Sequence, residues 1–204
     1  MDTFPPILRD FPHQFETERL LIRLPLPGDG VYVNEAIHES LDHLKPWMLW
    51  AQNPPTIEET EINVRQAHCH FLERVDLRFH LFEKKTKRFI GSSGLHQIDW
   101  NIPKFEIGYW CRVSESGKGY ITEAVRGLTV FAFEILGAKR VEIRCDERNI
   151  RSRKVAERLG YRLEGVLRNH RLAVDDRLEN TCVYAMTPDD FRFQSSRQRV
   201  SASQ

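Results

Sequence analysis

The sequence has few cysteines, and the four that it has, Cys69, Cys111, Cys145 and Cys182, stand far apart. None forms a CxxC pair, so neither a disulfide framework nor a cysteine zinc site is expected. The run His68-Cys69-His70 offers metal-binding side chains. It lies in a predicted helix, however, where residues two apart project about 200° from one another. We therefore expect no metal, and the free thiols fit a reducing, cytoplasmic location.

An excess of one charge is also missing, since 30 Lys and Arg residues nearly balance 29 Asp and Glu residues. No global basic field therefore favours direct nucleic-acid binding or a membrane surface. No apolar run approaches the roughly 20 residues that cross a bilayer, and residues 1–6 show no secretory signal. One region differs, because residues 139–171 contain eleven basic residues and five acidic ones. That local excess suits a polyanionic ligand.

The length of 204 residues and the 41% hydrophobic content suit one domain with an ordinary core. Apolar spacing of three and four residues predicts helices over 31–44, from the Thr56–Glu59 capping box to 74, after residue 120, and over 149–159. In the third of these helices, Val125, Leu128, Ala132 and Ile135 are expected on one buried face. Strands are predicted over 17–24, 78–82, 89–95, 105–112, 141–145, from 161, and over 183–186. This order predicts an α/β (α+β) domain with a mixed sheet.

The most informative segment is a loop in which Gly117 and Gly119 flank Lys118, between an aromatic strand-like run and a helix. Glycines at a helix start turn backbone N–H groups toward an anion, where the helix dipole adds positive charge. A P-loop is excluded, because Gly119 follows the lysine where Ser or Thr must stand. A dinucleotide fingerprint is weak, because Thr122 takes the place of its third glycine.

Three passages together resemble the GNAT superfamily of acetyl-CoA-dependent N-acetyltransferases, in particular its RimJ/RimL-type branch, which acetylates ribosomal-protein N-termini. They are Thr17-Glu18-Arg19-Leu20-Leu21-Ile22-Arg23, then Glu106-Ile107-Gly108-Tyr109-Trp110 with Gly117-Lys118-Gly119-Tyr120, and finally Asn149-xx-Ser152 with Leu159-Gly160-Tyr161. The resemblance covers residues 16–187, with 1–15 and 188–204 as terminal extensions. It implies a mostly antiparallel central sheet flanked by helices, with two strands splayed apart for the coenzyme.

The resemblance also implies a binding site for acetyl-CoA. The loop residues Ser116, Gly117, Lys118, Gly119, Tyr120, Ile121 and Thr122 would cradle the pyrophosphate, and Tyr109, Trp110, Cys111, Asn149 and Ser152 would line the pantetheine arm. The family usually has Arg or Gln at position 116 and Gly or Ala at position 121, so Ser116 and Ile121 depart from its pattern. The basic run 148–158 is a candidate for the adenosine 3′-phosphate.

For the chemistry, the resemblance assigns Ser152 to the leaving thiolate and makes Glu106 the leading base, with His96 and Asp99 as rivals. Some ribosomal-protein acetyltransferases have a glutamate after the second helix, but Arg171 stands near that place here, beside His170. Trp47, Trp50 and His96 are candidates for acceptor binding, although core packing also explains the two tryptophans. The expected acceptor is a protein or peptide N-terminal α-amine. A small amine and a non-catalytic acyl-CoA-binding module stay open as alternatives, and a homodimer is compatible with the family.

Overall fold

The structure, a computed structural model, describes residues 4–193 of the chain, and its centre is one eight-stranded sheet. The strands lie in the order β1-β2-β3-β4-β5-β6-β8-β7, and every neighbouring pair is antiparallel except β5 and β6. Their bounds are β1 Gln14–Glu16, β2 Leu20–Arg23, β3 Leu77–Glu83, β4 Phe89–Asp99, β5 Lys104–Cys111, β6 Arg140–Asp146, β7 Arg162–Leu172 and β8 Leu178–Met186. The predicted mixed, mostly antiparallel sheet is confirmed.

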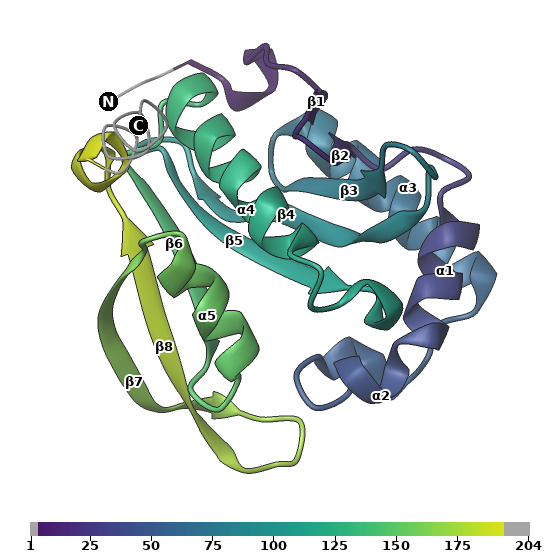
Figure 1. Cartoon of the computed structure of the whole chain (residues 1–204). Helices are drawn as coiled ribbons and strands as arrows, with labels where there is room; N and C mark the ends of the chain where they lie inside the picture. The colour runs from purple at the N-terminus through teal and green to yellow at the C-terminus, as the bar shows by residue number, and fades with distance from the viewer. Residues whose placement is uncertain (1–3, 194–204) are drawn as a thin grey trace, which may run out of the picture.

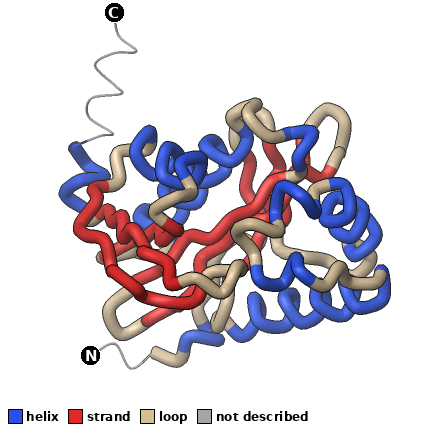
Figure 2. The backbone as a smooth tube through the Cα atoms, turned by 90° about the horizontal axis from the view of Figure 1, so that it is seen from below, coloured by secondary structure: helices blue, strands red, loops and turns tan. Residues whose placement is uncertain are grey.

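Helices cover both faces of this sheet (Figures 1 and 2). They are α1 Gly30–Glu39, α2 Leu41–Leu44, α3 Ile57–Glu73, α4 Tyr120–Val130 with the π-helix η4 Phe131–Ile135, and α5 Ile150–Arg158, with short 3-10 turns η1 Pro6–Leu8, η2 Leu49–Gln52 and η3 Val113–Glu115. The main core cluster joins α4 and α5 to the strands, and a smaller one joins α1 and α3 to Phe82 and Phe89. No helix within residues 4–193 is long and apolar enough to cross a membrane.

The parallel pair β5 and β6 stays together over only three positions. Lys104, Phe105 and Glu106 pair with Arg140, Val141 and Glu142, and β5 then runs on to Cys111 without a partner on that side. The strands β6, β8 and β7 fan away from β5 beyond this point (Figure 1). The unpaired backbone of β5 is thereby open to a ligand, as the predicted splay requires.

The helix predicted over 31–44 is broken at Ser40, which separates α1 from α2. Ser40 is fully buried, and its Oγ accepts a hydrogen bond of 2.9 Å from the backbone N of Val113. Arg112 adds ion pairs to Glu35 and Glu39 of α1. The break therefore anchors α1 and α2 to the segment that follows β5, a long-range contact that helical periodicity does not reveal.

The expected burial of Ile135 is wrong, because its side chain is 51% exposed. The end of this helix is a π-helix, in which the N–H of Leu136 donates to the carbonyl of Phe131. A π turn takes more residues than an α turn, so the buried positions shift away from the 3.6-residue period. Phe131, Ala132 and Leu136 are buried instead.

The ends of the sheet extend beyond the predicted strands. β7 continues to Leu172 and β8 begins at Leu178. The extent of β7 was not predicted because almost all of this strand is solvent-exposed and it lacks the apolar alternation that marks a half-buried strand. The edge strand β1, Gln14–Glu16, begins within the predicted N-terminal extension 1–15. Residues 188–193 are helical, and the rest of the two extensions, 1–3 and 194–204, lies outside the described residues.

Candidate active site

The glycine loop leads directly into helix α4. Gly117 and Gly119 have φ angles of 78° and 83°, in the left-handed region that favours glycine. Gly119 is the N-cap residue of α4 and has no side chain to cap the helix. The first-turn N–H groups have no acceptor within the helix, and together with the helix dipole they form an anion-binding site.

The first motif of the sequence holds this loop in place. Arg19 Nε lies 2.6 Å from Glu123 Oε2 of α4, and Arg19 Nη1 donates to the carbonyl of Lys118 over 3.0 Å. Thr17 Oγ1 donates to the other oxygen of Glu123 at 2.6 Å. These contacts join the start of β2 to the start of α4, so the Thr17–Arg19 motif positions the loop from 100 residues away in the sequence.

A cavity of about 590 Å³, here called the loop cavity, lies beside the glycine loop and the unpaired end of β5. All but one of the residues that the resemblance assigned to the coenzyme line it, namely Tyr109, Trp110, Cys111, Ser116, Gly117, Gly119, Tyr120, Ile121, Thr122, Asn149 and Ser152. The exception is Lys118, whose Nζ lies 2.9 Å from Glu115 Oε2. Burial raises the pKa of Cys111 to about 12, so this thiol stays protonated near neutral pH.

The basic run 148–158 divides into two sets. Arg151, Lys154 and Arg158 line the loop cavity, because positions three and four apart share one face of α5. Arg148 pairs with Asp146 at 2.7 Å, and Arg153 donates to Tyr184 Oη at 3.2 Å. The first set gives the loop cavity a cationic wall that suits a second phosphate.

The start of α5 carries a pair of hydroxyls. Asn149 is the N-cap residue, and its Oδ1 accepts a hydrogen bond of 3.0 Å from the N–H of Ser152. Ser152 Oγ lies 2.9 Å from Tyr109 Oη, and the Tyr109 hydroxyl donates to the carbonyl of Ser152 over 3.1 Å. The pair bridges the splay from α5 to β5. Burial raises the pKa of Tyr109, so its phenol remains a proton donor.

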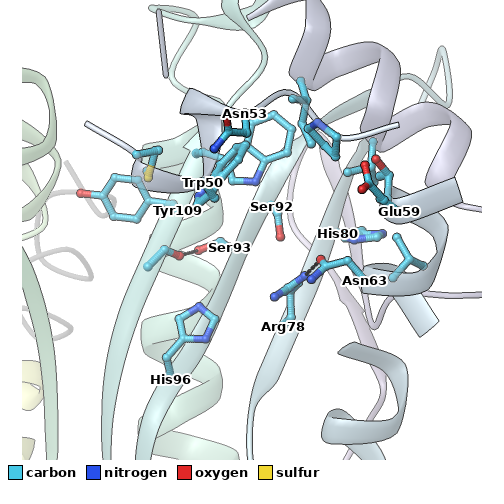
Figure 3. Close-up of a pocket in the computed structure, with 18 residues that line it drawn as sticks. Trp50, Asn53, Glu59, Asn63, Arg78, His80, Ser92, Ser93, His96 and Tyr109 are labelled. Atoms are coloured by element: carbon cyan, nitrogen blue, oxygen red, sulfur yellow. Dashed lines mark hydrogen bonds between the residues drawn. The ribbon is translucent and has the colours of Figure 1, made fainter. Parts of the chain in front are cut away.

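A second cavity of about 550 Å³, here called the histidine cavity, lies on the other side of β5 between the sheet and helices α1 and α3. Trp50, Asn63, Arg78, His80, Ser92 and His96 are among its lining residues (Figure 3). Met48, Tyr109 and Trp110 line both cavities. The two cavities therefore meet at the unpaired end of β5.

His96 lies on the sheet at the floor of this cavity, on the side opposite Trp50 (Figure 3). Its Nδ1 is 2.6 Å from Asp76 Oδ2. A Cβ at Gly94 would lie 2.8 Å from the imidazole, and a Cβ at Gly108 would lie 3.0 Å from it. These two glycines therefore make room for the ring. Burial favours the neutral form of Asp76, but the hydrogen bond to His96 outweighs it and lowers the pKa of that carboxyl.

Glu106 is at the last paired position before the splay, directly opposite His96 on β4. It lines a third cavity of about 390 Å³ together with Arg144, His170 and Arg171. Burial raises the pKa of Glu106 above its usual 4.5, although Arg144 Nε, 3.6 Å away, acts in the opposite direction. A carboxylate with a raised pKa at this point is a candidate proton acceptor.

The other predicted residues lie as follows. Trp50 is in the histidine cavity and packs edge-on against Trp110, with ring centroids 6.0 Å apart, whereas Trp47 lines the loop cavity. Asp99 lines none of the three cavities, and its Oδ1 accepts from the N–H of Asn101 in the β4–β5 turn. Within residues 4–193, no three His, Cys, Asp or Glu side chains are grouped as metal ligands.

Sequence reasoning missed three groups, which are the hydroxyl of Tyr109, the carboxylate of Asp76 and the guanidinium of Arg78. Tyr109 was expected to line the pantetheine arm, but no role was assigned to its hydroxyl. Asp76 and Arg78 stand two apart where β3 begins, and residues two apart share a face of a strand. That alternation was the available signal, but their pairing with β4 was needed to place them beside His96.

Comparison with known proteins places this architecture in a family. The family model described as an acetyltransferase (GNAT) domain matches residues 19–162. The "Putative ribosomal N-acetyltransferase YdaF" of Bacillus subtilis is 35% identical over 155 residues, which cover 74% of this chain and 82% of that protein. The ribosomal-protein-serine acetyltransferase of Escherichia coli is 27% identical over 148 residues, covering 71% and 82% of the two chains.

Solved structures agree. A "Probable acetyltransferase" with 28% identity superposes with a TM-score of 0.80 over 87% of this chain and 98% of its own. RimL, an α-N-protein acetyltransferase of ribosomal L7/L12 in complex with coenzyme A, shares the fold at 20% identity, with a TM-score of 0.79 over 85% and 97% of the chains. The chain therefore belongs to the GNAT acetyltransferases and is an N-acetyltransferase of that family.

Proposed function

We propose that the loop cavity binds acetyl-CoA, with the pyrophosphate on the backbone of residues 116–121 and the pantetheine arm along the unpaired end of β5. The fit rests on the shape and chemistry of the cavity. Gly117 has open space around its missing Cβ, the first turn of α4 presents N–H groups, and α5 supplies a cationic wall. Structures of the same fold support the proposal, since MccE is in complex with acetyl-CoA and AMP, and RimL is in complex with coenzyme A.

The acceptor in this proposal is the N-terminal α-amine of a protein or peptide, as in a ribosomal-protein acetyltransferase. The observation that carries it is the meeting of the two cavities at Met48, Tyr109 and Trp110. A thioester held in one cavity would face an amine held in the other, so the acetyl group passes directly between them. The names of two relatives, YdaF and the ribosomal-protein-serine acetyltransferase, support this class of acceptor.

Two proton movements are assigned to this chain. An α-amine has a pKa of about 7.7–8.0, so a sizeable fraction is neutral near pH 7 and only modest help from a base is needed. Glu106 takes this proton, directly or through a water molecule. At the other end, the hydroxyls of Ser152 and Tyr109 donate to the developing thiolate, the charge that forms when acetyl-CoA gives up its acetyl group.

The direct test is transfer of labelled acetyl from acetyl-CoA to a panel of peptides with free and blocked N-termini, beside a panel of small amines. We expect label on the free α-amines, no label on the blocked peptides, and micromolar binding of acetyl-CoA by calorimetry. Label on small amines alone would replace the peptide acceptor by the alternative of a small-molecule acetyltransferase. Binding of acetyl-CoA without transfer to any amine of a cell extract would favour the alternative of a non-catalytic acyl-CoA-binding module.

The expected cytoplasmic location and homodimer belong to the same proposal. Light scattering coupled to size-exclusion chromatography tests the dimer, and a mass of 24 kDa at micromolar concentration would contradict it.

A further inference from the structure

One of the residues that line the histidine cavity is Arg78, an arginine without an ion-pair partner among the described residues. The guanidinium of Arg78 lies at the cavity floor and donates from Nη1 to Asn63 Oδ1 over 2.6 Å (Figure 3). Within residues 4–193, no carboxylate oxygen lies within 4.0 Å of its nitrogens. A guanidinium has five N–H donors, and Asn63 takes one of them, which leaves further donors of this lining residue for a ligand.

Three other buried or partly buried arginines of this fold are paired with carboxylates, whereas the buried Arg74 donates to the main-chain carbonyls of Arg9 and Phe71. Arg23 lies 2.6 Å from Asp29, Arg112 contacts Glu35 and Glu39, and Arg140 contacts Glu142 at 2.5 Å. Arg78 differs from them because the nearest carboxylate, that of Asp76, is bonded to His96. Burial lowers the pKa of Arg78, which Asp76 only partly offsets. A buried cation without a counter-ion costs free energy, and a bound anion would recover it.

The other ionisable groups that line the cavity are hydrogen-bonded within the protein, and none of them is a second unpaired cation among the described residues. Glu59 Oε2 accepts hydrogen bonds from Thr56, at 2.8 Å from its N–H and 3.0 Å from its Oγ1, as part of the capping box of α3. His80 is bonded through Nδ1 to Asp29 at 2.8 Å. Arg78 is therefore the group of this cavity whose charge a ligand would meet.

The position of Arg78 in the sheet gives its distance from the unpaired end of β5, where the acetyl group would be transferred. Arg78 pairs with Gly94 of β4, and Gly94 pairs with Gly108 of β5. Neighbouring strands are about 4.8 Å apart, so Arg78 begins roughly 10 Å from β5, where the two cavities meet. An extended peptide advances about 3.3 Å per residue. The arginine side chain extends from this position into the cavity. A carboxylate in contact with its guanidinium would therefore belong to the second or third residue of an acceptor peptide whose amine lies at β5.

We infer that the acceptor is an amine that carries a carboxylate close by, specifically a peptide with Asp or Glu at its second or third position, and that Arg78 binds this carboxylate. The inference rests on the proposed function for the transfer itself. A bidentate or charge-assisted contact from a guanidinium to a carboxylate is among the stronger polar interactions in proteins. Arg78 therefore acts as a selectivity residue for the acceptor.

The test compares C-terminally amidated tripeptides, which carry no terminal carboxylate, that differ only in Glu or Gln at the second position, and then at the third. The readout is kcat/KM with acetyl-CoA as the donor. The wild type should prefer the Glu peptide by about 10- to 100-fold, the range of one charge-assisted contact. In Arg78→Gln this ratio should fall toward one, and in Arg78→Lys it should stay above one. Arg126→Gln, at an exposed position of α4, is the matched control and should keep the wild-type ratio.

Equal rates for the Glu and Gln peptides in the wild type, or a preference that persists in Arg78→Gln, would overturn the inference. A second arm uses β-alanine and β-alaninamide. If these small amines are acetylated and the peptides are not, and if the wild type but not Arg78→Gln prefers β-alanine to β-alaninamide, then the proposed peptide acceptor is wrong and the anion site at Arg78 is supported. If no amine is acetylated, calorimetry in the presence of coenzyme A compares the affinities of the N-acetylated Glu and Gln tripeptides. Tighter binding of the Glu peptide would support the anion site, and equal affinities would reject the inference.

Discussion

At the scale of single residues, the central contact is the 2.9 Å approach of Ser152 Oγ and Tyr109 Oη. Either hydroxyl is chemically able to donate to a thiolate, and the raised pKa of Tyr109 keeps the phenol protonated. Because the two groups are bonded to one another, we propose that they act as one unit. In that proposal the serine at the family position and the tyrosine of β5 together donate the proton to the leaving thiolate.

This predicts a non-additive pair of substitutions. Ser152→Ala and Tyr109→Phe should each lower kcat by about 100-fold, the lower range for a general acid, while the affinity for acetyl-CoA by calorimetry changes little. The double variant should lose little more than either single variant. Tyr161→Phe is a matched control, because this buried tyrosine bonds to Thr129 and lines neither cavity. Multiplicative losses would show that the hydroxyls act separately.

Glu106 predicts a pH dependence. A base works in its ionised form. The value of kcat/KM already falls below the pKa of the acceptor amine, about 7.7–8.0, and it should fall more steeply as the pH drops through the pKa of Glu106, which burial raises above 4.5. In Glu106→Gln the rate at neutral pH should fall by about 100-fold, and this steeper acidic limb should disappear while the limb of the amine remains. Rate profiles between pH 5 and 9 measure both effects. A limb that survives in Glu106→Gln and disappears in His96→Gln would transfer the role to His96.

At the scale of elements, the glycine loop and α4 form one binding unit whose backbone conformation matters more than its side chains. Gly117 and Gly119 both have positive φ angles, and Lys118 between them pairs with Glu115. The motif that begins at Thr17 fixes the unit through Glu123. Ser116 and Ile121 depart from the family pattern, yet both line the loop cavity, and a backbone cradle tolerates such changes.

Alanine at these glycines should therefore weaken coenzyme binding. Gly117→Ala and Gly119→Ala strain a left-handed residue by about 1 kcal/mol, and any relaxation turns N–H groups away from the phosphate. We expect a rise in the Kd for acetyl-CoA of about tenfold in calorimetry. Gly137→Ala has the same type of strain, with φ 68° and open space at its Cβ, but lies after η4. Gly137→Ala should lower the stability of the fold and leave the Kd for acetyl-CoA unchanged. An equal rise of the Kd in Gly137→Ala would show that the loop variants act through general destabilisation.

Elements also show where periodicity succeeds. The helix α5 and the capping box of α3 occur as predicted, because a capping residue and one apolar face fix a helix locally. The break at Ser40 and the π turn at Phe131–Ile135 were not predictable in this way. Both arise from contacts with other parts of the fold.

At the scale of the whole molecule, a buried charge network holds the wall of the histidine cavity to the sheet. Asp29, just before α1, accepts from Arg23 of β2 at 2.6 Å and from His80 of β3 at 2.8 Å. Asp29 is 4% exposed, and His80, which lines the cavity, is 1% exposed. Burial opposes ionisation of Asp29, but the hydrogen bonds from His80 and Arg23 outweigh it and lower the pKa of this carboxyl well below its usual 3.8.

Asp29→Asn should therefore destabilise the fold by about 3 kcal/mol at pH 7, because it leaves Arg23 without its buried partner. The sign with pH follows from the lowered pKa. The contribution of Asp29 is complete above 3.8 and is lost progressively as the pH falls below it. Urea unfolding at pH 7 and pH 3 measures this. A variant as stable as the wild type at pH 7 would show that the network does not support the fold.

The sequence alone determined the family and most of the strand and helix order, and it predicted the coenzyme residues. These depend on local signals, namely apolar periods, capping residues and short motifs that resemble those of the GNAT family. The predicted loop residues, Lys118 aside, line one cavity for this reason. The resemblance to the family predicted that β5 and β6 separate. The structure shows where they separate, because Glu106 is the last residue of β5 that pairs with β6.

Only the tertiary structure brought Asp76, Arg78 and His96 together, and only it joined Tyr109 to Ser152. These contacts connect residues 20 and 43 positions apart, through the register of neighbouring strands and the packing of α5 on the splayed strands. No local pattern encodes such a register, since the side chains involved are polar and give no periodic signal. The donor side was therefore readable in the chain, whereas the acceptor side is created by the fold.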